Sequence, residues 1–233
     1  MKKIQIHELK FSDVSFGYNN NDLIFENLNF EFTKPHPVVL QGPLGSGKRT
    51  LLKLILGLYP ILGGSYFING KRVDNMSFKE FDLYRPSIGH SFESGGLLNN
   101  RTIFENLTLP IEYHKFIPKN EINDYVDKFL CHFHLEDSKN IRPAFVSSGV
   151  RKVVNLIRAF LLRPEFIILD GPTQGLAPEY QTQLVELIHL HLTEYNLKYL
   201  VVTSDDDHFI EKIGGRIYLV KRSEVIHELK RTA

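Results

Sequence analysis

The sequence has little of what disulfide-rich, secreted or membrane-spanning chains need. Its one cysteine, Cys131, excludes an internal disulfide framework and is typical of a reducing compartment. The longest apolar stretch, Leu51 to Leu62, is interrupted by Lys53 and Pro60 and is too short to span a bilayer. The N-terminus MKKIQIHELKF lacks the apolar core and cleavage site of a signal peptide. Any membrane role is therefore expected to come through a partner.

An excess of charge of either sign is also missing. The chain has 28 Lys+Arg against 27 Asp+Glu, a net charge of +1. No general attraction to nucleic acid or acidic lipid follows, and no nucleic-acid partner is expected. With 233 residues, 42% of them hydrophobic, the chain can bury a sizeable core. The absence of repeats and low-complexity linkers favours one compact domain.

The hydrophobic pattern predicts an α/β fold. Alternating or short apolar runs predict strands at residues 4–18, 23–32, 37–42, 63–73, 165–170, 198–204 and 215–228, with a hairpin turn at Asn69-Gly70. Helical periodicity predicts helices at residues 48–57, 118–135, 150–162 and 178–195. Because helix and strand alternate in the later half of the chain, the sheet is expected to be mostly parallel.

The stretch GPLGSGKRT, Gly42 to Thr50, fits the phosphate-loop pattern G-x-x-x-x-G-K-[S/T] except near its end. It lies between a predicted strand and a predicted helix, the context that such a loop requires. Its backbone N–H groups and the helix N-terminus would cradle phosphates, and Lys48 would contact the β- and γ-phosphates. The candidate nucleotide-binding residues of the loop are Gly42, Gly45, Ser46, Gly47, Lys48, Arg49 and Thr50.

The hydroxyl position that would hold Mg²⁺ is occupied by Arg49. The adjacent Thr50 cannot simply replace it, because one helical step rotates a side chain by about 100°. Three outcomes remain open for Arg49. Its charge could stand where the ion would lie and support Mg²⁺-independent binding, its side chain could point into solvent, or it could fill the phosphate pocket and exclude nucleotide.

Three further segments resemble ABC-transporter ATPases. Phe145 to Pro178 resembles their signature helix, Walker B strand and D-loop, with VSSGV in place of LSGGQ and the Walker B aspartate at Asp170. Ser91 to Pro110 is similar to the Q-loop segment of the Mla/Mce-type lipid-transporter branch. Tyr18 matches the aromatic residue that stacks on adenine in these proteins. The resemblance covers essentially the whole chain.

The resemblance implies an ABC-type P-loop NTPase fold, with a mostly parallel core sheet, an antiparallel β subdomain and a helical subdomain. Residues 1–233 would form a single domain. Its antiparallel β part would comprise about residues 1–35 and 60–75, and its helical part about residues 95–162. By the same resemblance, Tyr18, the glycine loop and Asp170 would bind nucleotide. Ser147, Ser148 and Gly149 of the signature would face the nucleotide of a second subunit in a head-to-tail dimer.

The chain departs from the family pattern at five chemical positions. Arg49 replaces the Mg²⁺-binding hydroxyl and Glu93 the Q-loop glutamine; the others are Gly171 for the catalytic glutamate, Ala177 for the D-loop aspartate and Ser204 for the switch histidine. In the signature, Ser148 and Val150 replace a glycine and a polar residue. Loss of a general base alone typically costs about 10²–10⁴-fold in rate. Nucleotide could still dock on the retained residues, Mg²⁺ binding is in doubt without its hydroxyl ligand, and hydrolysis is expected to be lost or very weak.

The function that follows is a degenerate nucleotide-binding subunit of a lipid transporter. Its implied partners are a transmembrane permease, a second nucleotide-binding subunit and an MCE-type lipid-binding protein. The chain would lie at the cytoplasmic face of the inner membrane, attached through the permease, with Glu93 to Asn106 facing it. One alternative is an active ATPase that uses Glu80, Glu93 or Asp205 as its base. Another is a structural or regulatory module that binds no nucleotide.

Smaller features have structural interpretations. The pairs His132/His134 and His189/His191 lie in predicted helices, where side chains two residues apart diverge, so metal binding is not favoured. Cys131 is interpreted as a small packing residue rather than a nucleophile. The acidic run Ser204 to Asp207 predicts a helix N-cap followed by an acidic first turn, with His208 too far along that helix to replace the switch histidine.

Overall fold

The computed structural model describes residues 3–19, 22–32, 36–93, 96–222 and 224–229. Its strands are β1 (Leu9–Asn19), β2 (Asp22–Phe32), β3 (Pro37–Gln41), β4 (Gly63–Ile68), β5 (Lys71–Arg72), β6 (Ile88–Ser91), β7 (Phe166–Asp170), β8 (Tyr199–Thr203), β9 (Arg216–Lys221) and β10 (Glu224–Leu229). Its helices are α1 (Lys48–Ile55), α2 (Phe78–Asp82), α3 (Ile103–Tyr113), α4 (Ile122–His132), α5 (Ser148–Phe160), α6 (Pro178–Thr193) and α7 (Asp207–Lys212). Short 3₁₀ turns lie at Val73–Asn75, Arg85–Ser87, Lys119–Glu121, Glu136–Ser138 and Pro143–Phe145.

The strands form two sheets. A six-stranded sheet has the order β10-β9-β3-β8-β7-β6, and all of its pairs are parallel except β9 with β10. A four-stranded antiparallel sheet has the order β2-β1-β4-β5. The predicted mostly parallel sheet is thus confirmed, and the strands predicted within residues 215–228 form the antiparallel pair of β9 and β10. The hairpin turn is confirmed too, since Asn69 and Gly70 have φ angles of 52° and 72° and join β4 to β5.

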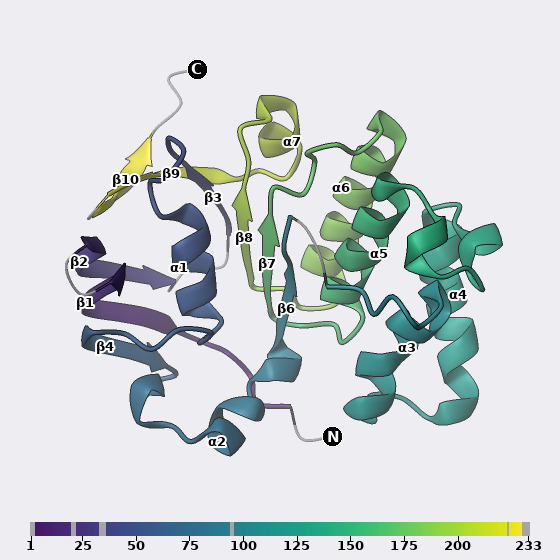
Figure 1. Ribbon diagram of the computed structural model, residues 1–233, viewed down its shortest axis with the longest axis horizontal. Coiled ribbons are helices and arrows are strands. Elements are labelled where there is room, and N and C mark those ends of the chain that lie inside the picture. Colours follow the sequence, from purple (N-terminus) through teal and green to yellow (C-terminus); the bar gives the residue numbers. More distant parts are fainter. Residues whose placement is uncertain (1–2, 20–21, 33–35, 94–95, 223, 230–233) are drawn as a thin grey trace.

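The parallel sheet separates two hydrophobic cores. Along β7, Ile167 and Leu169 face a core built with α3, α4, α5 and α6, because side chains alternate along a strand. Phe166 and Ile168 face the other core, which contains α1 and the antiparallel sheet. Figure 1 shows this arrangement, with α1 to the left of β8, β7 and β6 and with α5 and α6 to their right. Helices therefore cover both faces of the sheet, as a buried parallel sheet requires.

Helix ends follow their local sequence in several places. Helix α1 ends at Ile55 and is followed by Gly57 with φ 62°, close to the predicted end. Helix α7 has Asp206 as its N-cap, whose side chain accepts from Phe209 N, and Asp207 in its first turn, as predicted. The prediction for His134 is wrong: this residue lies beyond the end of α4 and has φ 52°.

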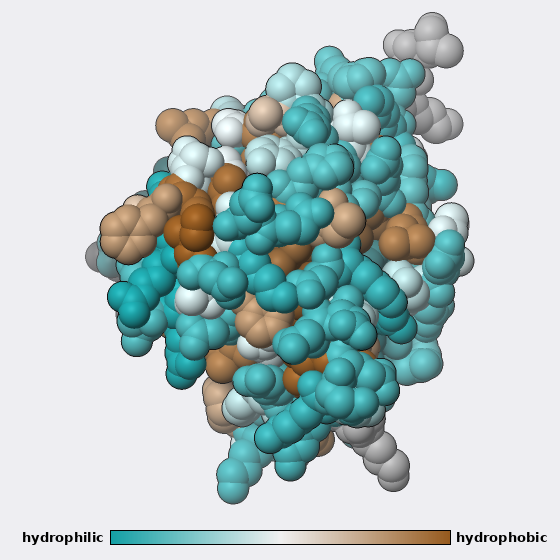
Figure 2. All heavy atoms as spheres, turned by 90° about the vertical axis from the view of Figure 1, so that its right-hand side faces the viewer, coloured by the Kyte–Doolittle hydropathy of each residue, from teal (hydrophilic) through white to brown (hydrophobic). Residues whose placement is uncertain are grey.

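The side of the molecule over α3 and α4 is mainly hydrophilic, with separate apolar patches (Figure 2). The large apolar residues exposed on this part of the chain are Leu109, Tyr113, Ile141 and Phe145. Cys131 is also exposed, so its interpretation as a packing residue is wrong. A contact with Glu136 raises the pKa of its thiol, which disfavours the thiolate. Among the residues that the structure describes, no helix has the length and apolar character needed to cross a bilayer.

Candidate functional site: a phosphate loop with an arginine bridge

The glycine loop connects β3 to α1 at the carboxyl end of the parallel sheet. Its last glycine, Gly47, is the N-cap of α1 and has φ 99°, a left-handed conformation that favours glycine. A Cβ atom at Gly47 would also lie 2.8 Å from the side chains of Ile24 and Phe25. Gly42 and Gly45 line the same loop. The loop and the N-terminus of α1 therefore form the cradle that binds phosphate in this arrangement.

Two polar side chains of the loop suit a phosphate ligand. Ser46 is buried, and its Oγ has no hydrogen-bond partner within the described part of the chain. A buried hydroxyl without a partner is costly, and a phosphate oxygen would satisfy it. Lys48 folds back over the loop, where its Nζ donates to the carbonyl oxygens of Gly42 and Pro43. The ammonium group is thus held at the mouth of the cradle.

Arg49 does not point away from the site into solvent. Its Nε donates to Oδ2 of Asp170 over 3.0 Å, and its Nη2 forms an ion pair with Oε2 of Glu93. Asp170 ends β7, and Glu93 follows β6, the neighbouring strand in the sheet. One guanidinium therefore joins α1 to the ends of two adjacent strands. The solvent-pointing alternative for Arg49 is wrong.

Asp170 is buried, and both of its oxygens are engaged. Oδ1 accepts a hydrogen bond from Thr203 Oγ1 over 2.6 Å, and Oδ2 accepts from Arg49. The Thr203 hydroxyl in turn accepts from the backbone N–H of Gly171 over 2.8 Å. Nothing in the sequence pattern singled out Thr203, although it ends the strand next to β7.

The residue after Asp170 is Gly171, which has no side chain that could act as a base and whose carbonyl group binds the ammonium group of a lysine. Gly171 has φ 54° and no side chain. Its carbonyl oxygen accepts from Nζ of Lys152 in α5 over 2.6 Å, and the same Nζ contacts the carbonyl of Gln174. Burial lowers the pKa of Lys152, while nearby Asp170 opposes that shift. Sequence reasoning missed Lys152, because a lysine in an amphipathic helix carries no motif.

Ser204 and Ala177, the other two departures from the family pattern, do not provide the imidazole and carboxylate groups found at these positions in the family. Ser204 is buried, and its Oγ accepts from the backbone N–H of Asp206 over 3.1 Å. The hydroxyl oxygen of Ser204 thus takes part in a local turn, and the Ser204 carbonyl oxygen accepts a hydrogen bond from Gln41 Nε2. Ala177 is the N-cap of α6 and offers no side-chain hydrogen bond there.

The three carboxylates considered as substitute bases, Glu80, Glu93 and Asp205, either have other partners or are exposed to solvent. Glu80 closes a capping box with Ser77 at the start of α2, and these hydrogen bonds lower the pKa of its carboxyl. Glu93 is paired with Arg49. Asp205 is exposed between β8 and α7. Within the described residues no hydrogen bond or ion pair links Glu80 or Asp205 to Asp170.

Tyr18 lies beside the phosphate loop, as an adenine-stacking residue would. Its hydroxyl is 3.3 Å from Oγ1 of Thr50 in the first turn of α1. Edge contacts with Phe16 and Tyr59, at ring-centroid distances of 5.4 and 5.5 Å, fix the ring while 54% of the residue stays exposed. Thr50 itself is buried, and its hydroxyl faces Tyr18.

The signature residues lie on the other side of the sheet from the phosphate loop. Ser147 is the N-cap of α5, and its Oγ accepts from the backbone N–H of Val150 over 3.2 Å. Ser148 and Gly149 form the first turn, which contains no acidic residue. Ser147 and Ser148 are exposed. Since α1 and α5 pack on opposite faces of the sheet, one chain does not bring the signature to its own loop.

Three of the four paired histidines contact backbone carbonyl groups, whereas His134 Nε2 lies 3.9 Å from Oε1 of Glu179. His132 Nε2 lies 2.8 Å from the carbonyl oxygen of Gln183, and His189 Nε2 lies 2.8 Å from that of Lys212. His191 is fully buried, with Nδ1 2.9 Å from the carbonyl oxygen of Leu187. In the described ranges no group of His, Cys, Asp and Glu has the arrangement of a metal site.

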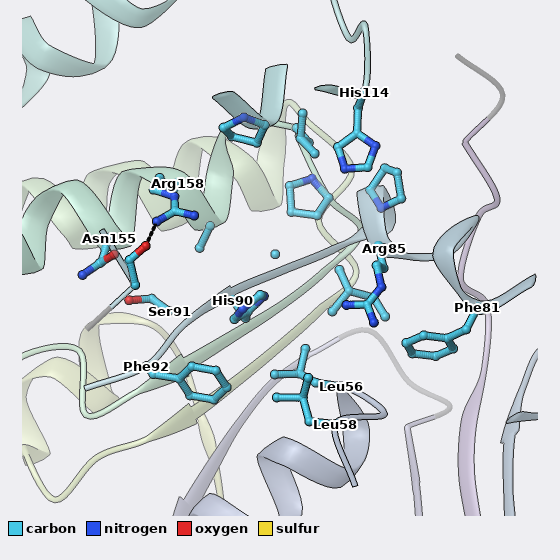
Figure 3. A pocket seen from close by; sticks show the side chains of 18 residues that line it. Leu56, Leu58, Phe81, Arg85, His90, Ser91, Phe92, His114, Asn155 and Arg158 are labelled. Carbon is cyan, nitrogen blue, oxygen red and sulfur yellow. Dashed lines mark hydrogen bonds between the residues drawn. The ribbon is translucent and has the colours of Figure 1, made fainter. Parts of the chain in front are cut away.

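A pocket of about 260 Å³ lies at the edge strand β6, between the loop after α1 and helix α5 (Figure 3). Arg158 reaches across its wall to the carbonyl of Gly96. Apolar side chains line it together with Arg85 and Arg158, which carry its positive charge. Burial lowers the pKa of His114 and lowers that of His90 to about 4, so these two lining histidines are neutral near pH 7. The pocket therefore suits a partner segment that is apolar with an acidic group.

Comparisons with known proteins agree with this geometry. Residues 25–174 match the family described as "ABC transporter". Two relatives named "Methionine import ATP-binding protein MetN 2" come from different strains of Bacillus cereus. One is 32% identical over 95% of this chain, and the other is 36% identical over 95%. The chain spans 66% of the length of these relatives.

The chain also superposes on a solved structure with a TM-score of 0.85 at 26% identity. That structure is the dimeric ATP-binding cassette MJ0796 in a post-hydrolysis state bound to ADP and Pi. The match covers 97% of this chain and 99% of that one. The relatives are named for methionine import, so they lend no support to the lipid-transporter branch. Family match, fold and phosphate loop agree: the chain belongs to the ABC transporter family, as an ATP-binding domain of that family.

Proposed function

We propose that this chain is a nucleotide-binding subunit of an ABC transporter whose own site binds ATP but hydrolyses it extremely slowly. Its second role is to complete, with its signature residues, the site of a hydrolysis-competent partner subunit. The observation that carries this proposal is the residue after β7: Gly171 offers a left-handed backbone and a lysine contact where a general base is needed.

Nucleotide binding is supported by what the site retains. The loop places backbone N–H groups at the N-terminus of α1, where an anion is stabilised. Ser46 supplies a buried hydroxyl without a partner in the described part of the chain, and Lys48 supplies a cation at the loop mouth. Tyr18 supplies an exposed ring fixed by its neighbours, and base–aromatic stacking is worth about 1–3 kcal/mol.

Slow hydrolysis is supported by what surrounds the γ-phosphate position. A water must be oriented and deprotonated there, and neither Gly171 nor Ser204 offers a group for this work. Lys152, whose Nζ contacts the Gly171 carbonyl, is a cation and a hydrogen-bond donor. A loss of about 10²–10⁴-fold for the base alone makes this chain's own turnover negligible beside that of an intact subunit.

The partner role is supported by the start of α5. Its N-cap serine and exposed first turn, with no acidic residue, form an anion-attracting helix terminus. One chain keeps this terminus on the opposite face of its sheet from its own loop. A second subunit, of the same or a different sequence, is therefore needed to bring phosphates to it.

The pocket at β6 is the proposed docking site for a transmembrane permease, through which the chain would lie at the cytoplasmic face of the inner membrane. It adjoins the segment that follows Glu93, and its mixture of apolar and cationic side chains fits an apolar permease helix with an acidic residue.

Ser91 to Pro110 points to a lipid cargo and an MCE-type partner, whereas the named relatives import methionine. Cargo-stimulated turnover with lipid and with methionine in separate assays distinguishes these two cargo classes.

The decisive experiment compares turnover in three assemblies: the chain alone, the chain with its permease, and the chain with permease and an intact second ATPase subunit. We expect ATP to bind in all three and turnover to appear only in the third. Turnover in either of the first two would identify an active ATPase and contradict the proposal. Assembly without any nucleotide binding would identify a structural module instead.

A further inference from the structure

The cation position of this site is already occupied by a side chain. P-loop NTPases hold Mg²⁺ between the hydroxyl that follows the loop lysine and the carboxylate at the end of the Walker B strand. In this chain the first of these residues is Arg49 and the second is Asp170, and the two are hydrogen-bonded to each other over 3.0 Å. The guanidinium thus lies between the two elements that a metal would otherwise join.

The residues present do not fit Mg²⁺. That ion needs near-ideal octahedral oxygen ligands at about 2.0–2.1 Å. Asp170 accepts a hydrogen bond from Thr203 on one oxygen and from Arg49 on the other, so an ion that approaches Oδ2 meets the Arg49 guanidinium already bound there. The hydroxyl of Thr50, the nearest candidate to replace the missing ligand, lies against Tyr18. A divalent ion would also be placed beside the positive charge of Arg49.

Building on the proposed function, we propose that Arg49 replaces Mg²⁺ as the counter-cation of the bound nucleotide, so that this chain binds ATP independently of magnesium. A guanidinium has five N–H donors in a rigid fork that matches phosphate oxygens. The ion pair with Glu93 and the bond to Asp170 use Nη2 and Nε, and 57% of the Arg49 side chain remains exposed. The remaining donors are therefore available to a phosphate group.

Glu93, which replaces the Q-loop glutamine, belongs to the same change as Arg49. A neutral glutamine at this position would suit a metal ion, since its amide oxygen is a ligand without charge. A carboxylate suits a guanidinium, with which it forms a charge-assisted hydrogen bond. The two departures from the family pattern, Arg49 and Glu93, contact each other directly. We therefore treat them as one coupled change rather than two separate losses.

The charges predict the strength of binding as well as its metal dependence. One fixed positive charge here faces two carboxylates, whereas a metal site has a divalent ion facing one carboxylate. Arg49, Glu93 and Asp170 together sum to a net charge of −1, against +1 for such a metal site, so the net charge of this cluster does not attract the phosphate chain. Affinity then depends on the directional hydrogen bonds of Arg49, Lys48 and the loop, none of which needs a dissolved ion.

The test is a calorimetric titration of the full chain with ATP, once in excess EDTA and once in excess MgCl₂. We expect the two dissociation constants to agree within about twofold. The double variant Arg49→Ser/Glu93→Gln restores a hydroxyl and a neutral amide, and its ATP affinity should rise at least about tenfold when Mg²⁺ is added. Arg72→Ser, which breaks the distant ion pair with Asp74, is the control for arginine loss and should stay indifferent to Mg²⁺.

Three results would overturn this inference: tightening of wild-type binding about tenfold or more by Mg²⁺, a double variant that stays indifferent to Mg²⁺, or no ATP binding by the wild-type chain in either buffer. Circular dichroism of each variant verifies that it is folded. The proposed function fails on a different measurement. Turnover by the chain without a second ATPase subunit contradicts slow hydrolysis, whatever the metal dependence of binding.

Discussion

Lys152 of α5 donates a hydrogen bond from Nζ to the carbonyl oxygen of Gly171, over 2.6 Å. The contact places an ammonium group beside the backbone where the family has its catalytic glutamate. The positive charge of that ammonium group would lower the pKa, and with it the basicity, of a carboxylate introduced nearby. The surroundings of Gly171 therefore favour a weaker base than a carboxylate without a cationic neighbour would be.

Gly171→Glu is expected not to restore hydrolysis. Glutamate in the left-handed conformation of Gly171, φ 54°, costs roughly 1–2 kcal/mol, and its Cβ would lie 3.0 Å from Oε1 of Gln174. We expect a lower urea midpoint and no measurable turnover by the isolated chain. Gly214→Glu is the matched control, since Gly214 has φ 64° and open space around it. Recovery of turnover in Gly171→Glu would show that base loss alone disables the site.

The variant Ser147→Asp tests whether the start of α5 binds the partner's phosphates in addition to being capped by the side chain of residue 147. Aspartate caps a helix about as well as serine, so the free energy of unfolding should change by less than about 0.5 kcal/mol. Its negative charge would repel the partner's nucleotide, and turnover of the mixed complex should fall at least about tenfold. Ser147→Asn keeps the cap without the charge and should retain more activity. Equal turnover in both variants would argue against a role for α5 in the partner's site.

Tyr18→Ala should weaken ATP binding by about 5–150-fold, because it removes a stacking surface worth about 1–3 kcal/mol. Tyr18→Phe keeps the ring and loses only the hydroxyl that lies 3.3 Å from Thr50 Oγ1. Its dissociation constant should stay within about twofold of the wild-type value. Calorimetry with ATP measures both. An unchanged affinity in Tyr18→Ala would place the adenine elsewhere.

The stability of the chain should fall as the pH is lowered from about 6.5 towards 4, because of His191. Burial, and to a smaller extent Arg163, lower the pKa of His191 from 6.5 to about 4. The unfolded chain therefore takes up a proton in this window while the folded chain does not, which favours unfolding.

Between pH 7.5 and pH 5 we expect a loss of roughly 2 kcal/mol from this residue. Urea unfolding at the two pH values measures it. His191→Leu, which keeps an apolar side chain against Phe160 and Tyr195, should show a smaller loss over the same interval. An identical pH dependence in the variant would assign the effect to other groups.

Leu58→Asp should weaken co-purification with the permease without reducing ATP binding. Leu58 lines the pocket at β6 and is 46% exposed, so an aspartate there remains hydrated in the free chain. In the complex its charge would be buried at an apolar contact, which is costly. Leu190→Asp, on α6 away from the pocket lining, is the matched control. Equal recovery of both variants with the permease would exclude this docking site.

Much of the scaffold could be predicted because its signals are local. β7 is apolar from Phe166 to Leu169, and the glycine pattern between β3 and α1 identifies the phosphate loop without any long-range information. Helix α2 was not predicted, although a capping box of Ser77 with Glu80 marks it. Helix α3 lies within the predicted helical part, residues 95–162, but its bounds were not predicted, although Thr102 and Glu105 form a capping box at its start. Pro110 inside α3 obscured the helical pattern there.

The arrangement of the site could not be predicted in the same way. Arg49 and Asp170 are 121 residues apart, and their contact depends on how β6 and β7 pair and where each ends. The sequence showed that Arg49 and Glu93 both departed from the family pattern, but their meeting is a property of the fold. Lys152 and the exposure of Cys131 likewise depend on which helix face packs inward.

The bridge from Arg49 to Glu93 and Asp170 makes the counter-cation part of the polypeptide. A dissolved ion occupies a site only when its concentration approaches its dissociation constant, whereas a tethered group is present at the effective concentration of an intramolecular contact. Chelation or magnesium starvation would then leave this junction between α1, β6 and β7 unchanged. Its strength would respond instead to ionic strength, because more than half of the Arg49 side chain is exposed to screening by salt.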